Sequence, residues 1–132
     1  MSQTDQPPLA GIRILDFSRV IAGPLATQQL ADLGATVLKV ENPVTGDEVR
    51  GFDADGNPAR SPFFIAFNRS KQSVAIDLKK PAGQTLARDL AMKCDVLVQN
   101  YRPGVMERFG LDHASLEDLN PGLVYVSVSA YG

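Results

Sequence analysis

Cysteine, tryptophan and histidine are scarce in this sequence. It contains one cysteine, one histidine and no tryptophan in 132 residues. A lone cysteine cannot form an internal disulfide, which favours a reducing compartment and predicts a cytoplasmic location. Cys94 directly precedes an apolar run and has no histidine near it in sequence, so we interpret it as a packing residue rather than a nucleophile. His113 lies in a polar turn without a partner motif and is interpreted as a surface residue.

Long apolar runs and an excess of positive charge are also absent. No run approaches the roughly 18 residues that a membrane span needs, and residues 1–8 lack the basic and apolar regions of a signal peptide. The net charge is −2, which gives no support for non-specific nucleic-acid binding. We therefore predict neither a membrane nor a nucleic acid as partner, and no metal site. The length suits one domain, placed at residues 9–132 after a flexible arm over residues 1–8.

Short apolar runs alternate with helical patterns along the chain. Strands are expected at residues 12–17, 36–40, 73–77, 95–98 and 123–129, and helices at residues 24–33, 61–67, 81–93, from 103 onward, and at 115–119. Residues 41–61 are expected to form a long loop. In the helix at 81–93, Leu86, Leu90 and Ala91 are expected to share the buried face. This alternation predicts an α/β fold, a Rossmann-like doubly wound and mostly parallel sheet flanked by helices.

Polar and cationic residues follow two of the expected strands. Residues 99–110 come directly after the strand at 95–98 and contain Arg102 and Arg108 beside a helix start, and Lys79 lies just past the third strand. Open α/β sheets bind ligands at the carboxyl ends of their strands, and such cations suit a phosphate-bearing ligand. The alternative is that both arginines are solvated surface charges. A Gly-x-Gly-x-x-Gly fingerprint is missing after the first strand, so a dinucleotide site is not predicted.

Charge is also unevenly distributed in the middle of the chain. Residues 41–55 hold five acids and one base, whereas residues 60–80 hold five bases and one acid. This contrast predicts a basic edge beside the ligand cleft. The alternative is that the two segments are solvated loops that partly neutralise each other.

A series of short motifs resembles one known family. The motifs are L-A-G-I-R-I-L-D at 9–16, A-G-P at 22–24, A-D-L-G-A at 31–35, N-R-S-K at 68–71, I-D-L-K at 76–79, and N-Y-R-P-G at 100–104 followed by Glu107 and Arg108. In order and spacing they resemble the family III CoA-transferases, which include formyl-CoA transferase, carnitine CoA-transferase and the α-methylacyl-CoA racemases. The resemblance extends from about Leu9 to Gly132.

The resemblance implies a binding site for coenzyme A (CoA). It implies backbone contacts from Val20 and Ile21, and a lining of the adenosine and phosphate portion by Ile76, Asp77, Leu78, Lys79, Asn100, Tyr101, Arg102 and Arg108. Asn42 stands where formyl-CoA transferase has a basic residue, so one charge-assisted contact is expected to be lost at that position. CoA or acyl-CoA would be a substrate, and no prosthetic group is implied.

The resemblance also implies an activity, the transfer of CoA between an acyl-CoA and a carboxylic acid through intermediates on an aspartate nucleophile. In the resembled proteins that aspartate lies beyond the segment matching Val124–Gly132, so no catalytic residue is assigned here. We expect the chain to be the N-terminal part of a longer protein, homodimeric when complete and inactive in this short form. Two alternatives stay open, an α-methylacyl-CoA racemase fragment and a non-catalytic CoA- or nucleotide-binding module.

Overall fold

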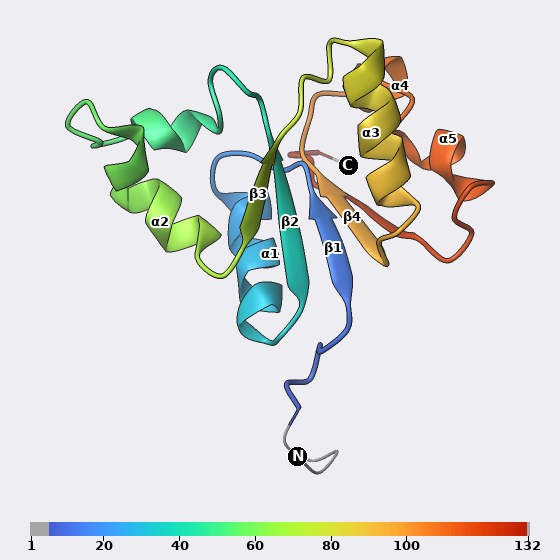
Figure 1. Ribbon diagram of the computed structural model, residues 1–132, viewed down its shortest axis with the longest axis horizontal. Helices are drawn as coiled ribbons and strands as arrows, with labels where there is room; N and C mark the ends of the chain where they lie inside the picture. Colours follow the sequence, from blue (N-terminus) through green and yellow to red (C-terminus); the bar gives the residue numbers. More distant parts are fainter. Residues whose placement is uncertain (1–5, 132) are drawn as a thin grey trace.

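The computed structural model describes residues 6–131, which form one five-stranded sheet between two layers of helices (Figure 1). The strands are β1 (Arg13–Asp16), β2 (Thr36–Glu41), β3 (Gln72–Ala75), β4 (Val96–Gln99) and β5 (Val124–Ser127). Their order is β3-β2-β1-β4-β5, and every neighbouring pair is parallel. This confirms the predicted α/β fold. The chain order reverses between β1 and β4, which is where such sheets bind ligands.

The helices are α1 (Ala22–Asp32), α2 (Pro62–Asn68), α3 (Pro81–Ala91), α4 (Val105–Arg108) and α5 (His113–Glu117). The segment predicted as a loop contains two short 3₁₀ helices, η2 (Glu48–Gly51) and η3 (Pro58–Arg60). Helix α5 begins two residues earlier than predicted because Asp112 is its N-cap and accepts a hydrogen bond from the Ser115 amide at 3.3 Å. No helix within residues 6–131 combines the length and apolar character that crossing a bilayer requires.

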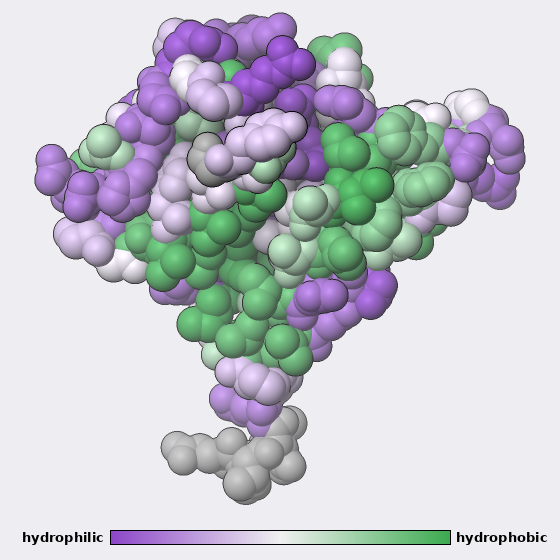
Figure 2. All heavy atoms as spheres, turned by 180° about the vertical axis from the view of Figure 1, so that it is seen from behind, coloured by the Kyte–Doolittle hydropathy of each residue, from purple (hydrophilic) through white to green (hydrophobic). Residues whose placement is uncertain are grey.

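Alternating residues of the strands divide the core into two clusters, one on each face of the sheet. Leu15, Leu97 and Met106 belong to the larger cluster, which packs under α3, α4 and α5. Ile14, Val37 and Val98 belong to the smaller cluster, under α1. That second face is less completely covered, because Val124 and Val126 of β5 are 56% and 37% exposed. Figure 2 shows apolar side chains gathered on this side of the molecule.

Helix α3 packs on the sheet through small residues, which the sequence pattern did not predict. Leu86 is 47% exposed, whereas Ala87 and Ala91 are completely buried. A Cβ atom on Gly83 would lie 2.1 Å from the Asp77 carbonyl oxygen, so only glycine fits there. Small residues at a spacing of four bring this helix close to the sheet, and Leu86 is left on the outer side. The expected burial of Leu86 is therefore wrong.

The first described residues of the chain contact the turn between α1 and β2. Gly34, with a φ of 103°, ends α1, and the amides of Gly34 and Ala35 donate to Ala31 and Leu30 carbonyls in a Schellman motif. The helix begins two residues before the predicted start. Of the arm predicted over residues 1–8, residues 1–5 lie outside the described part. Pro7 contacts the turn, since a Cβ on Gly34 would lie 2.4 Å from its Cβ.

Candidate functional site

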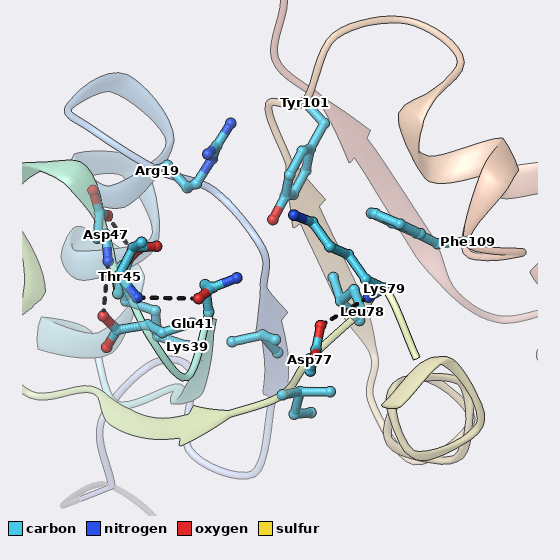
Figure 3. A pocket seen from close by; sticks show the side chains of 14 residues that line it. Arg19, Lys39, Glu41, Thr45, Asp47, Asp77, Leu78, Lys79, Tyr101 and Phe109 are labelled. Atoms are coloured by element: carbon cyan, nitrogen blue, oxygen red, sulfur yellow. Dashed lines mark hydrogen bonds and ion pairs between the residues drawn. The ribbon is translucent and has the colours of Figure 1, made fainter. Parts of the chain in front are cut away.

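A cavity of about 240 Å³ opens at the carboxyl edge of the sheet (Figure 3). Its lining comes from the segments that follow β1, β3 and β4 and from the end of β2 with its following turn. These residues are Arg19, Lys39, Val40, Glu41, Asn42, Thr45, Gly46, Asp47, Ile76, Asp77, Leu78, Lys79, Tyr101 and Phe109. The cavity lies at the edge that the sequence predicted for ligand binding.

Six of the predicted site residues line this cavity, namely Asn42, Ile76, Asp77, Leu78, Lys79 and Tyr101. Ile76 and Leu78 are buried and form an apolar part of the wall. Lys79 is exposed, and its ammonium group points toward the Tyr101 ring (Figure 3). Burial raises the pKa of the Tyr101 phenol, so its hydroxyl stays protonated at neutral pH. The cavity therefore combines Lys79, whose side chain is unpaired among residues 6–131, with an aromatic ring and an apolar surface.

A second, more open hollow of about 510 Å³ adjoins the first, and Tyr101 lines both. Asn100 and Arg102 line it together with Ala22, Pro103 and residues 128–131. The other predicted residues, Val20, Ile21 and Arg108, line neither hollow. Val20 and Ile21 lie in the loop between β1 and α1, and Arg108 is exposed at the end of α4. The structure thus brings most of the predicted residues to one edge and leaves Arg108 outside both hollows.

The Asn100 amide joins the two loops at the point where the strand order reverses. Its Nδ2 donates to the Arg19 carbonyl at 2.8 Å, and its Oδ1 accepts from the Arg19 amide at 2.8 Å. Both polar atoms of the side chain are therefore used to hold the β1–α1 loop. Asn42 has a similar role after β2, because its Oδ1 accepts from the Val44 and Thr45 amides at 2.8 and 3.0 Å.

Val20 has an unusual backbone conformation in the same loop. Its φ is 71°, in the left-handed region that β-branched residues rarely adopt. Such a conformation costs on the order of 1–3 kcal/mol and persists where surrounding contacts enforce it. The Val20 amide donates to Asp47 Oδ1 at 3.1 Å. Strained residues of this kind cluster at ligand sites.

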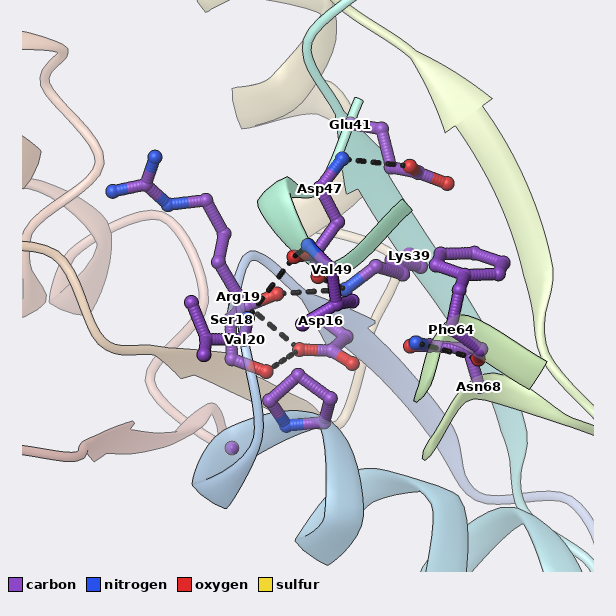
Figure 4. Close-up of polar contacts among 12 residues, drawn as sticks. Asp16, Ser18, Arg19, Val20, Lys39, Glu41, Asp47, Val49, Phe64 and Asn68 are labelled. Atoms are coloured by element: carbon purple, nitrogen blue, oxygen red, sulfur yellow. Dashed lines mark hydrogen bonds and ion pairs between the residues drawn. The ribbon is translucent and has the colours of Figure 1, made fainter. Parts of the chain in front are cut away.

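Two buried ion pairs lie beneath this loop, and Figure 4 shows the residues of one of them, Lys39 and Asp47. Lys39 Nζ is 2.8 Å from Asp47 Oδ2, and both side chains are at most 1% exposed. Lys71 Nζ is 3.0 Å from Asp16 Oδ2 and also donates to the Pro24 carbonyl at 2.9 Å. Burial lowers the pKa of Lys71, and the nearby Asp16 carboxylate opposes that shift. Both lysines are thus paired inside the protein.

Asp16, at the end of β1, has a structural role. Its Oδ1 accepts from the Ser18 amide at 2.9 Å, and its other oxygen accepts from Thr27 of α1 as well as Lys71. These contacts tie the end of β1 to the loop and to the helix that follow it.

Glu41, at the end of β2, is held in its ionised form. Arg50 donates to both of its carboxylate oxygens at 2.7 and 2.8 Å, and Ser73 donates to Oε1 at 2.7 Å. Burial by itself would raise the pKa of Glu41, but these hydrogen bonds and the charge of Arg50 outweigh it and lower the pKa to about 2. Glu41 therefore lines the cavity as an already paired carboxylate.

The predicted basic edge is reduced to one residue. Of the five bases at residues 60–80, only Lys79 lines the cavity. Arg69, Lys71 and Lys80 form ion pairs with Asp32, Asp16 and Asp77 instead. No ion pair among residues 6–131 joins the acidic segment 41–55 to the basic segment 60–80 either. The charge contrast therefore supplies one cation, Lys79, to the lining of the cavity.

Sequence reasoning missed eight of the fourteen residues that line the cavity, among them Arg19 and Phe109. The Arg19 guanidinium carbon lies 4.6 Å from the centre of the Tyr101 ring, and the Phe109 ring meets Tyr101 edge to face at 6.4 Å. A signal for Arg19 was present, because it follows the carboxyl end of β1 as Lys79 follows that of β3. Phe109 had no such signal, since it reaches the cavity only through the turn after α4.

The remaining chemically notable residues lie away from the cavity. Cys94 is half-buried against the larger core cluster, and burial raises the pKa of its thiol, as expected for a packing cysteine. His113 is exposed at the start of α5, as predicted. Within the described part of the chain, no three or more histidine, cysteine, aspartate or glutamate side chains gather so that they could hold a metal ion.

Comparisons with known proteins agree with the sequence motifs. Succinyl-CoA:glutarate CoA-transferase of Mus musculus is 43% identical over 125 residues, which are 95% of this chain and 29% of that protein. Formyl-CoA:oxalate CoA-transferase of Afipia carboxidovorans is 43% identical over 124 residues, covering 94% of this chain and 29% of that protein. The crystal structure of a CAIB/BAIF family protein from Brucella suis superimposes with a TM-score of 0.88 at 36% identity, over 96% of this chain and 34% of that one.

The chain thus spans about a third of the length of these relatives. A family model described as CoA-transferase family III matches residues 9–132, which is nearly the whole chain. The motifs, the parallel sheet and these similarities agree, and the chain belongs to CoA-transferase family III.

Proposed function

We propose that this chain is the CoA-binding part of an acyl-CoA:carboxylate CoA-transferase. The observation that carries the proposal is the cavity at the carboxyl edge of the sheet, where Lys79, Tyr101 and the apolar residues Ile76 and Leu78 meet. The names of the relatives support the same reaction class, since they are CoA-transferases acting on succinyl-CoA or formyl-CoA.

The residues at this edge suit the nucleotide end of CoA, which carries a 3′-phosphate, a diphosphate and a flat adenine. Lys79 would supply a compact positive charge for a phosphate, while Tyr101 and the apolar wall would cover the base. Arg102 and Arg108 are exposed and make no side-chain hydrogen bond or ion pair within residues 6–131, so both are free to meet phosphate oxygens. Val20 and Ile21 would contribute backbone contacts, held in place by Asn100.

The wider parts of the proposal rest on the resemblance and on the relatives' names. The substrates would be an acyl-CoA and a carboxylic acid, with no prosthetic group. We propose a homodimer in the cytoplasm as the working form.

Calorimetric titration of CoA into the 132-residue chain tests the proposal. We expect a dissociation constant in the micromolar to millimolar range. Replacing Lys79 or Arg108 by alanine should each weaken binding about tenfold, because a charge-assisted hydrogen bond contributes roughly 1.5–3 kcal/mol. Arg60→Ala is the matched control, because Arg60 is exposed and lines neither hollow. Absence of binding to the unmodified chain, or equal affinity in all three variants, would contradict the proposal.

A further inference from the structure

We infer that the buried Lys39–Asp47 pair is a positioning device, which holds the backbone of residues 18–20 in the shape that the CoA site requires. The inference rests on the proposed function and deepens it. It assigns Lys39 and Asp47 a role through the loop they hold rather than through direct contact with the ligand.

The backbone of this loop is hydrogen-bonded almost entirely by side chains from elsewhere. The Ser18 amide donates to Asp16, and the Ser18 carbonyl accepts from Lys39 Nζ at 2.8 Å. The Arg19 amide and carbonyl both bond the Asn100 side chain, and the Val20 amide donates to Asp47. Five consecutive polar backbone groups are therefore fixed by residues of β1, of β2, of the segment before η2 and of the segment after β4. Figure 4 shows Asp16, Lys39 and Asp47 around the loop.

Asp47 connects three parts of this arrangement. Its Oδ1 accepts from Val20 and also, at 3.2 Å, from the Val49 amide as the N-cap of η2. Its Oδ2 lies against Lys39, and its own amide donates to Glu41 at 3.1 Å. The left-handed Val20 is thus linked to the end of β2 through one completely buried carboxylate.

Stability alone does not explain a pair of this kind. Two charges removed from water lose their hydration, and apolar residues of similar size commonly stabilise a fold at least as well. What an apolar pair cannot do is hold the Ser18 carbonyl and the Val20 amide. Arg19, which lies between those two groups, lines the cavity beside Tyr101. The pair therefore sets where the Arg19 side chain and the neighbouring backbone meet a ligand.

Two double variants separate this role from a merely structural one. Lys39→Met with Asp47→Asn removes both charges but keeps an oxygen that can accept from Val20. Lys39→Met with Asp47→Leu keeps the branched shape of the side chain at position 47 and has no acceptor. CoA affinity is measured by calorimetry at a temperature where circular dichroism shows each variant folded, and exchange of the Val20 amide is followed by ¹⁵N NMR. Asp112→Ala, which removes the distant cap of α5, is the control for lost stability without loss of affinity.

We expect the asparagine variant, which loses only the Ser18 contact, to fall about threefold in affinity, and the leucine variant, which loses both contacts, to fall about tenfold or more, with faster exchange at Val20. Equal affinities in the two folded variants would overturn the inference. If the leucine variant does not fold, Lys39→Met with Asp47→Ala replaces it, because alanine also lacks an acceptor for the Val20 amide and is smaller than aspartate. The same loss of CoA affinity is expected, and an affinity equal to that of the asparagine variant would overturn the inference.

Failure of the proposed function can be distinguished from failure of this inference. If the unmodified chain bound no CoA, the proposed function would fail. The role of the Lys39–Asp47 pair in holding the loop would still be tested by amide exchange. Equal protection of the Val20 amide from exchange in both double variants would refute that role.

Discussion

Cationic side chains occur in two environments around the same sheet. Lys39 and Lys71 are almost completely buried, and each is paired with a carboxylate under the β1–α1 loop. Lys79, Arg102 and Arg108 are exposed, and within residues 6–131 their side chains make no hydrogen bond or ion pair. A buried charge must be paired because it has lost its hydration, whereas an exposed charge remains available. The first group therefore organises the loop, and the second group is the one that can meet an anionic ligand.

The largest expected effect comes from breaking a buried pair. Lys71→Met leaves Asp16 buried without its counterion and removes the bond to Pro24, so we expect a loss of about 3–5 kcal/mol in the free energy of unfolding. Urea denaturation measures it. Arg69→Met is the matched control, because the Arg69–Asp32 pair is exposed and is expected to contribute about 1 kcal/mol or less. Similar losses of unfolding free energy in the two variants would show that burial does not decide how strongly an ion pair supports the fold.

The next effect concerns Glu41 and depends on pH. The pKa of Glu41 is lowered from 4.5 to about 2 in the folded protein. The resulting stabilisation is complete above the unfolded-state value and is lost as the pH falls toward 2. Glu41→Gln should therefore lower the free energy of unfolding by about 3 kcal/mol at pH 7, and the difference from the unmodified chain should shrink steadily below pH of about 4.5.

Denaturation curves of both proteins across this pH range test the Glu41 prediction. Glu117→Gln, at an exposed carboxyl of α5, should leave the curves nearly superimposed. A difference at Glu41 that stays constant down to pH of about 2 would mean that ionisation of this carboxyl does not stabilise the fold.

The smallest expected effect tests the exposed group. Arg102→Ala should change the free energy of unfolding by no more than about 0.5 kcal/mol, since its side chain makes no hydrogen bond or ion pair with the described residues 6–131. Arg50→Ala is the contrasting variant, because Arg50 pairs with Glu41 and lies 3.5 Å over the Phe64 ring. A marked loss of stability in Arg102→Ala would place that residue with the paired cations rather than the free ones.

Much of the fold followed from local pattern. The alternation of apolar runs and helical segments predicted every strand, and Gly34 and Ser61 mark helix boundaries through chemistry that is local to the chain. The prediction failed where packing partners are distant in sequence. Leu86 looked like a core residue, but the close approach at Gly83 turned it outward.

The sequence also predicted part of the candidate site, and it failed again where partners are distant in sequence. Lys79 and Tyr101 lie within four residues of the carboxyl ends of β3 and β4, so the parallel topology alone brings them to one edge. Lys71 also stands next to a strand, yet it is buried because Asp16, 55 positions away, lies beside it. Asn100 fits a ligand-binding motif equally well, but both of its polar atoms hold Arg19.

The sequence by itself determined the succession of strands and helices, the family, and the edge of the sheet at which the predicted site residues gather, because periodicity, capping and short motifs act over a few neighbouring residues. Only the tertiary structure decided which polar residues serve the loop and which remain free. Burial and pairing depend on groups that the fold brings together from distant positions in the sequence, so a local sequence pattern does not predict them.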